Sequence, residues 1–264
     1  MFPLGSVAGR INAETALLLG GGRALLMQIA HPSIAAGVVD HSGFPGDPYS
    51  RLWRTLDTTL TVSFGDAAQS GAAATRVGTV HRRVRGERLE GRYDAMDPDL
   101  LLWVHATLVD SALETYDRFV RPLRPGVGER YYREMKRQAL AFEVPAEMLP
   151  AGLVEFRRYI ATTIETLDVR DEAIRLSAEI LYPPAPLALA PASALLRLIT
   201  VGLLPERLRS AFGLRWGPGR ERILDGSATC IRALVPLLPT AARSCPHART
   251  AAARTAAQNE GDST

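Results

Sequence analysis

Apolar residues recur along most of this chain at the three- and four-residue spacing of amphipathic helices, and alternation with a period of two is scarce. The stretch 51–85 shows the helical pattern most clearly. One apolar stripe there consists of Leu52, Leu56, Leu60 and Phe64. The adjacent face of the same helix carries Arg51, Arg54, Thr55, Thr58 and Val62. This arrangement directs hydrogen-bond donors at something partly buried.

Two dipeptides, Asp47-Pro48 and Asp97-Pro98, combine a helix cap with a first-turn proline and mark helix starts. Three glycines at 20–22 interrupt the first long helix, and Asp66 begins a new one. The pattern predicts nine or ten helices, over residues 10–31, 48–64, 66–85, 98–120, 129–142, 150–167, 171–181, 193–204, 205–212 and 218–238. We therefore predict an all-α fold, with one multi-helix globular domain over 1–247 and a disordered tail over 248–264.

Composition limits the possible functions. The 264 residues suffice for a sizeable core, and 47% hydrophobic and 22% charged residues are typical of a globular protein. The net charge is only +3 and the basic residues are spread along the chain, which argues against a nucleic-acid partner. Two cysteines fit neither a zinc site nor a disulfide framework, and no signal peptide is evident. We expect a cytoplasmic protein.

Two apolar stretches raise the question of a membrane. The longest uncharged run in the first half is short and contains Pro32, so no transmembrane segment is expected. The leucine- and proline-rich segment 180–204 is interpreted as packed core. A substrate entrance, a membrane-surface element and a dimer contact are the alternatives for this segment.

Four histidines lie within residues 31–105, and His81 has the clearest setting. It shares an otherwise apolar helix face with Ala73, Val77, Val80 and Val84. A lone histidine on such a face is usually a hydrogen-bonded core residue, and His105 is interpreted in this way. His31 is interpreted as a helix-ending residue whose charged form complements the helix dipole, and His41 as a loop or cap residue.

Several short motifs resemble the family of rubber oxygenases (latex clearing proteins) and MpaB-type oxygenases. The first is Arg51-x-x-Arg54-Thr55, followed 26 residues after Thr55 by Val80-His81-x-x-Val84-Arg85. Two further stretches resemble the bacterial branch, namely Gln28-Ile29-Ala30-His31-Pro32 through Asp40-His41-Ser42, and Trp103-Val104-His105-Ala106-Thr107-Leu108. The likeness is strongest over residues 23–119 and weaker to about residue 238.

The resemblance implies an all-helical oxygenase that encloses haem b and acts with dioxygen on an apolar substrate of the isoprenoid or lipid class. His81 would be the proximal ligand of the haem iron, and Arg51, Arg54 and Thr55 would line the opposite, distal side. Family members have lysine where this chain has Arg54. Because arginine does not readily release its proton, Arg54 would stabilise and orient rather than act as an acid. No glutamate is evident upstream of Arg51 to serve as a base in olefin cleavage.

Other interpretations stay open. The arginine stripe of residues 51–54 can be a solvated face, or it can form a structural ion-pair network with Asp47, Asp57 or Asp66. The chain can be a non-catalytic helical binding protein for an apolar metabolite. It can also be a non-haem metal enzyme that uses His31, His41 and His105, although no His-x-x-x-His spacing supports this.

Overall fold

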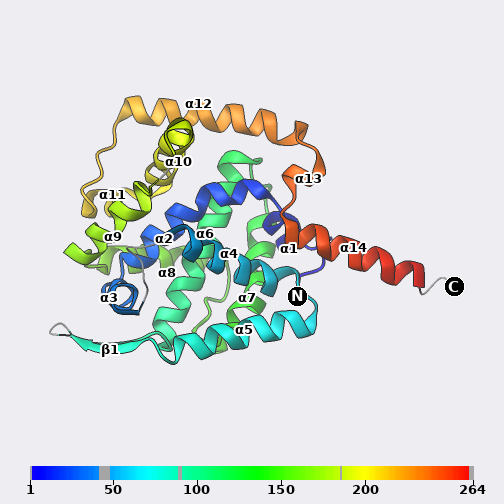
Figure 1. The fold of residues 1–264 in the computed structure, drawn as a ribbon, viewed down its shortest axis with the longest axis horizontal. Coiled ribbons are helices and arrows are strands. Elements are labelled where there is room, and N and C mark those ends of the chain that lie inside the picture. Colours follow the sequence, from blue (N-terminus) through cyan, green and yellow to red (C-terminus); the bar gives the residue numbers. More distant parts are fainter. Residues whose placement is uncertain (1, 42–47, 89–90, 185, 262–264) are drawn as a thin grey trace.

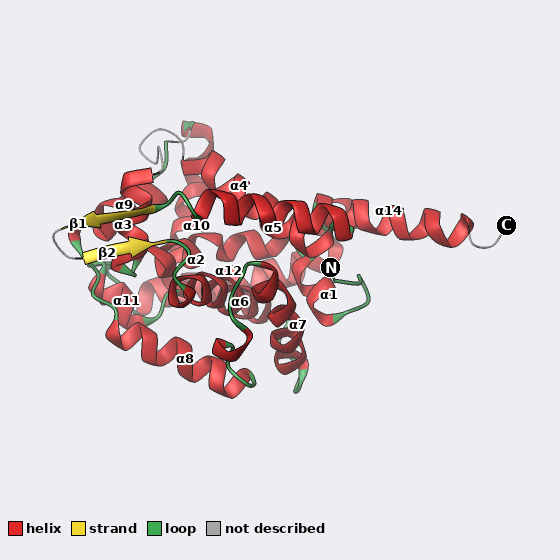
Figure 2. Ribbon diagram, turned by 90° about the horizontal axis from the view of Figure 1, so that it is seen from below, coloured by secondary structure: helices red, strands yellow, loops and turns green. Residues whose placement is uncertain are grey.

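The computed structural model describes residues 2–41, 48–88, 91–184 and 186–261, without the side chains of residues 48–54 and 259–261. Within this part of the chain the fold is all-α apart from one small hairpin (Figure 2), as predicted. The α-helices are α1 (Val7–Asn12), α2 (Gly21–Ile29), α3 (Pro32–His41), α4 (Pro48–Phe64), α5 (Ala67–His81), α6 (Pro98–Phe119), α7 (Val127–Ala141), α8 (Leu153–Thr166), α9 (Asp171–Leu181), α10 (Ala190–Leu203), α11 (Glu206–Ala211), α12 (Pro218–Leu234), α13 (Thr240–Arg243) and α14 (Pro246–Gly261).

Short helical pieces account for the difference from the nine or ten helices predicted. The described residues form fourteen α-helices. They also form the 3-10 helices η1 (Thr15–Gly20), η2 (Ala146–Met148), η3 (Leu187–Leu189) and η4 (Val235–Leu237). Glycines and prolines divide the longer periodic stretches of sequence into these pieces, because each breaks the regular backbone hydrogen bonding.

The 22-residue helix α6 lies in the middle of the molecule, with α2, α7 and α8 around it (Figure 1). Trp103 of α6 is almost completely buried, and its indole N–H donates to the Met27 carbonyl oxygen of α2 at 3.1 Å. The main hydrophobic cluster extends from α1 and α2 across α6 to α7, α8 and α9. One continuous core therefore holds helices from both halves of the chain.

The predicted start of α4 at Pro48 is confirmed, and so are both predicted helix caps that fall within the described residues. The Asp97 carboxylate accepts from the Asp99 backbone N–H at 2.9 Å, and Pro98 occupies the first turn of α6. At the start of α5, Asp66 and Gln69 form a reciprocal capping box. The third predicted cap, Asp47, lies outside the described residues.

The glycines at 20–22 interrupt the first helical stretch, as predicted, and they also have a packing role that the sequence did not show. Gly20 ends η1, while Gly21 and Gly22 begin α2. A Cβ on Gly20 would collide with the Thr115 side chain of α6, and one on Gly22 would lie 2.8 Å from Thr200 Cγ2 of α10. These positions lack side chains because two other helices pass close by, so they are sites of tight packing.

We predict that Gly22→Ala lowers the free energy of unfolding by about 1–3 kcal/mol, because the new methyl group overpacks the contact with α10. Gly71→Ala is the matched control. Gly71 lies inside α5, and a methyl group added there would have nothing within 4 Å, so this change should stabilise by about 0.5–1 kcal/mol through helix propensity. Urea unfolding of both variants measures the difference. Equal stabilisation by the two would contradict the tight contact.

Between the helices predicted over 66–85 and 98–120, the chain forms a two-stranded antiparallel hairpin of β1 (Arg85–Arg88) and β2 (Gly91–Asp94). Its strands are four residues long and only Tyr93 is buried, so no alternating pattern is visible in the sequence. Tyr93 packs over Gly37 of α3. Tertiary contacts with α3 therefore hold the hairpin.

The structure places residues 246–261 in α14, where the sequence predicted a disordered tail from residue 248. Cys245 and Ala248 are buried in a cluster with Phe64 of α4. The Arg254 side chain donates to the Phe64 carbonyl oxygen at 2.5 Å. Alanine favours helix formation, and docking on α4 adds the tertiary contacts that composition does not show. Beyond this docked part, α14 extends away from the body (Figure 1).

The proline-rich segment 180–204 is not packed core throughout. Leu187 in η3 is 90% exposed. Four more large side chains of the segment are exposed, namely Tyr182, Leu189, Leu195 and Leu196. Burial resumes only at Ile199, in the second half of α10. Among the described residues, no helix has both the length and the apolar character that crossing a membrane requires.

Candidate active site

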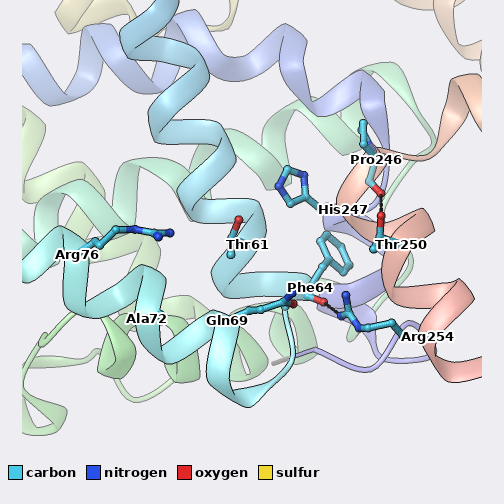
Figure 3. Close-up of a pocket in the computed structure, with 10 residues that line it drawn as sticks. Thr61, Phe64, Gln69, Ala72, Arg76, Pro246, His247, Thr250 and Arg254 are labelled. Carbon is cyan, nitrogen blue, oxygen red and sulfur yellow. Dashed lines mark hydrogen bonds between the residues drawn. The ribbon is translucent and has the colours of Figure 1, made fainter. Parts of the chain in front are cut away.

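Helices α4 and α5 carry the residues that the sequence singled out. They are joined at Gly65 and Asp66 and leave this turn in different directions (Figure 3). Arg51, Arg54 and Thr55 fall in the first half of α4, whereas His81 is the last residue of α5. All four positions therefore lie toward the ends of α4 and α5 that are far from this turn.

The proposed distal side is only partly described. Thr55 is half-buried, as expected for a residue that lines a pocket. The side chains of Arg51 and Arg54 lie outside the described part of the chain, so their distal role stays a prediction. Two of the acids considered as structural partners for these arginines have other roles. Asp66 caps α5, and Asp57 pairs with His247 of α14 at 3.1 Å.

His81 is half-buried at the C-terminal end of α5. Burial lowers the pKa of its imidazole, whereas the negative charge of Glu143 opposes this shift. The ring is consequently held in the neutral form, which has the lone pair that a metal requires. The helix face predicted around it is less apolar than expected, since Ala73 is buried but Val80 is 59% exposed. The reason is that α5 covers the body from outside and buries only part of its surface.

Glu143 is the acidic residue of this neighbourhood, and no motif in the sequence pointed to it. It follows α7 and has a left-handed backbone with φ 64°. Its carboxylate pairs with Arg82 at 3.0 Å and would lie 2.5 Å from a Cβ on Gly78. The close approach to Gly78 places Glu143 against the last turn of α5. Only the packing of α7 against this region brings the two together.

His105 differs most from its predicted role as a hydrogen-bonded core residue. It lies on α6, is only 4% exposed, and neither ring nitrogen has a hydrogen-bond partner in the described residues. Burial lowers its pKa to about 4, so the ring is neutral at pH 7. An unpaired buried polar group is unfavourable and is often found where function requires it. His105 is therefore a second neutral imidazole with an unused lone pair.

We predict that His105→Leu stabilises the chain by about 1–3 kcal/mol at pH 7.5, because it removes an unpaired polar group without creating a large cavity. The pH dependence should also change. The folded chain keeps His105 unprotonated between the ordinary pKa of 6.5 and the folded pKa of about 4. Unfolding then takes up a proton, so stability falls as pH drops from 6.5 toward 4, by up to about 1.4 kcal/mol per pH unit. Urea titrations at pH 7.5 and 5 test both effects. A variant that keeps the full wild-type loss of stability at pH 5 would contradict the assignment.

His31 and His41 flank α3. The His31 carbonyl accepts from Ile34 and Ala35, and its ring Nδ1 accepts from the Ser33 backbone N–H at 3.3 Å. His31 thus follows the end of α2, as predicted, and its ring also caps the start of α3. The Nδ1 acceptor role and the lowered pKa favour the neutral ring over the predicted cation. Burial lowers the pKa of His31, with Asp97 and Asp99 opposing.

His41 is exposed at the end of α3. Its Nε2 lies 3.1 Å from the Tyr93 hydroxyl. The three histidines of the non-haem alternative are not brought together. Among the described residues, which include His31, His41 and His105, no group of three potential ligands could hold a metal ion. The three-histidine metal site is therefore wrong.

A charged network that the sequence did not show links α3, the hairpin and α9. Arg88 of β1 pairs with both Asp40 and Glu172, and the Tyr93 hydroxyl donates to Asp40 at 2.5 Å. Hydrogen bonds from Arg88 and Tyr93 lower the pKa of Asp40 to about 2. Burial and the bond to Asp40 raise the pKa of Tyr93 to about 12.

The network borders a pocket of about 220 Å³ that His31 also lines. Its charged groups are paired with one another, so its role is to hold these elements together.

Comparisons with known proteins define the class. The profile of the family described as ER-bound oxygenase mpaB/B'/Rubber oxygenase, catalytic domain, matches residues 9–233, and this chain belongs to that family. It is also similar to the uncharacterized proteins Rv2237 of Mycobacterium tuberculosis and Mb2261 of Mycobacterium bovis. Identity with each is 26% over 223 residues, which cover 81% of this chain and 87% of the relative. No solved structure matches significantly.

The family match supports an oxygenase that acts on a small molecule and oxygen. It spans α1 to α12 and includes every residue of the candidate site. The resemblance noted from the short motifs is thereby confirmed at the level of the family. The match does not test the individual roles of His81, Arg51, Arg54 and Thr55.

Proposed function

We propose that this chain is a haem b-dependent oxygenase acting on an apolar substrate of the isoprenoid or lipid class. The observation that carries the proposal is the half-buried neutral imidazole of His81, at the end of α5 in a chain of the oxygenase family. Haem iron binds neutral imidazole. The imidazole of His81 therefore suits haem iron as a ligand. It is also the ligand that the family resemblance favours.

The remaining residues take roles that follow from their chemistry. When bound, haem supplies the iron centre at which dioxygen is activated. On the other side of the cofactor, Arg51 and Arg54 would provide guanidinium donors that stay protonated and stabilise negative charge as it develops. The Thr55 hydroxyl would add a neutral donor. Leu56 on the neighbouring stripe of α4 is half-buried and would offer apolar contact to the substrate.

Glu143 would act through His81 as a positioning residue. Its carboxylate favours the protonated ring and so opposes the effect of burial. A carboxylate near a ligating histidine commonly orients the ring and raises its basicity. Glu143 lies outside the motifs on which the resemblance rests, so this role is an inference from the structure.

The experiment begins with expression in the presence of a haem precursor, followed by an absorption spectrum and quantification of haem and iron per chain. A Soret band with one haem per chain, and oxygen consumption on addition of an isoprenoid oligomer, would support the proposal. Absence of stoichiometric iron together with thermal stabilisation by the same oligomer would instead favour the non-catalytic binding protein. One iron without porphyrin would overturn the haem assignment.

A further inference from the structure

A second cavity lies at the other end of α4 from the predicted distal residues. It has a volume of about 370 Å³ and is formed where α14 docks beside the turn between α4 and α5 (Figure 3). The residues that line it are Thr61, Phe64, Gly65, Gln69, Ala72, Arg76, Pro246, His247, Thr250 and Arg254. None of the predicted haem-site residues is among them, so this cavity is independent of the proposed oxygenase site.

The charged groups of the cavity are cationic. Arg76 and Arg254 line it from α5 and α14, and none of the described lining residues is acidic. Arg76 has no hydrogen-bond or ion-pair partner in the described residues, and Figure 3 shows its side chain extending from α5 toward α4. Arg254 donates through Nη2 to the Phe64 carbonyl oxygen, which leaves its other N–H groups available. Two guanidinium groups on one concave surface favour an anion, which each can bind with paired hydrogen bonds.

Two of the other polar groups of the cavity wall already have partners. His247 Nε2 lies 3.1 Å from Asp57 Oδ1, so this carboxylate is paired with a histidine and leaves both arginines free. The Thr250 hydroxyl likewise donates to the Pro246 carbonyl oxygen at 3.1 Å. The permanently charged donors of the wall are therefore the two guanidinium groups. The buried Nδ1 of His247 also has no hydrogen-bond partner among the described residues.

Apart from the side-chain amide of Gln69, the remaining wall is largely apolar. It is made by the ring of Phe64, the methyl group of Ala72 and the ring of Pro246, with the methyl groups of the two threonines. A volume of about 370 Å³ lies within the range of small-ligand pockets. A bare inorganic anion would use the guanidinium groups but leave the apolar wall uncovered. A molecule with an anionic head and an apolar body uses both.

We propose that this cavity binds a small organic carboxylate with an apolar chain, the carboxylate held by the unpaired guanidinium of Arg76 and the chain covered by Phe64 and Ala72. The ligand contacts three helices, namely α4, α5 and α14. Its binding therefore stabilises the docking of α14 on the α4–α5 turn. The ligand proposed for this cavity is an anion, whereas the substrate proposed for the oxygenase site is apolar.

Calorimetric titration of the full-length chain with octanoate tests the proposal, alongside n-octanol, which lacks the charge, and inorganic phosphate, which lacks the apolar chain. Octanoate should bind at least tenfold more tightly than either. Arg76→Gln should weaken octanoate binding at least fivefold by removing the unpaired guanidinium. Ala72→Leu should weaken it at least tenfold by filling the cavity without changing charge. Arg249→Gln, at an exposed arginine of α14 outside the lining, should leave the affinity unchanged.

Octanoate affinity that is the same in wild type, Arg76→Gln and Ala72→Leu would overturn the site. So would failure of wild type to bind octanoate. Equal affinity for octanoate and phosphate would overturn the role of the apolar wall. If Arg249→Gln weakened octanoate binding as much as Arg76→Gln, the effect of Arg76 would be one of general charge and not of a specific contact. Circular dichroism of each variant establishes that the helices are retained. No measurement in this set involves haem, so its outcome is separate from that of the proposed oxygenase function.

Discussion

His81→Ala should lose the haem of the reconstituted chain, with haem per chain falling at least tenfold and the Soret band disappearing. The physical reason is that alanine removes the imidazole lone pair through which the iron would be bound. Because His81 is half-buried at a helix end, the fold should survive and the helical circular dichroism should be unchanged. Quantification of bound haem after desalting, together with the absorption spectrum, measures the effect.

Two other histidine variants sharpen this result. His41→Ala, at the exposed end of α3, should retain the wild-type spectrum and haem content. His105→Leu removes the second neutral imidazole, which is buried and unpaired among the described residues. If haem were lost in His105→Leu but kept in His81→Ala, the ligand assignment would move from α5 to α6. If neither variant lost haem, neither His81 nor His105 would be the iron ligand.

Arg23→Ala should destabilise the chain by about 3–5 kcal/mol, because it leaves buried partners without their charge-assisted hydrogen bonds. The guanidinium of Arg23 is buried between α2, α6 and α10. Nη2 donates to Asp110 at 2.6 Å, Nη1 to Ser111 Oγ at 2.7 Å and Nε to the Leu203 carbonyl oxygen at 2.8 Å. One side chain thus joins three helices, and thermal or urea unfolding should show a large loss of stability.

An exposed ion pair supplies the matched control for this prediction. Arg133 pairs with Glu129 at 3.5 Å one turn away on α7, and its side chain is largely exposed. Arg133→Ala should cost less than about 1 kcal/mol, because water screens such pairs. The double variant Arg23→Met/Asp110→Leu should be more stable than Arg23→Ala, since no unpaired buried charge is left. Similar losses for Arg23→Ala and Arg133→Ala would mean that burial of Arg23 has no energetic importance.

The helical elements are the most predictable part of the chain, because their signals are local. The Asp97-Pro98 start of α6 and the Asp66 cap of α5 are predicted correctly, since a cap depends on side chains within three residues. The bounds 171–181 agree with α9 for the same reason. The hairpin over 85–94 is missed because its single buried residue, Tyr93, leaves no periodic pattern. Its stability comes from α3 and α9, far away in the sequence.

The candidate site divides in the same way. Short motifs are sufficient to place Arg51, Arg54 and Thr55 on α4 and His81 on α5, and to indicate the family. They did not show that α5 ends at His81, because the predicted helix continued to residue 85. They could not identify Glu143, which is brought to α5 by the packing of α7. Nor could they show that His105 lacks hydrogen-bond partners among the described residues, since its apolar helix face predicts burial but says nothing about what surrounds the ring.

The sequence by itself determined the all-α class, the main helix starts and the family, because helix periodicity, caps and short motifs are properties of neighbouring residues. Only the tertiary structure decided the role of the glycines at 20–22, the docking of α14 and the exposure of the proline-rich segment. These features depend on which helices meet, and residues far apart in the chain determine that. Burial and hydrogen bonding of a histidine are likewise tertiary properties, which is why the chemistry of His81 and His105 follows from packing rather than from spacing.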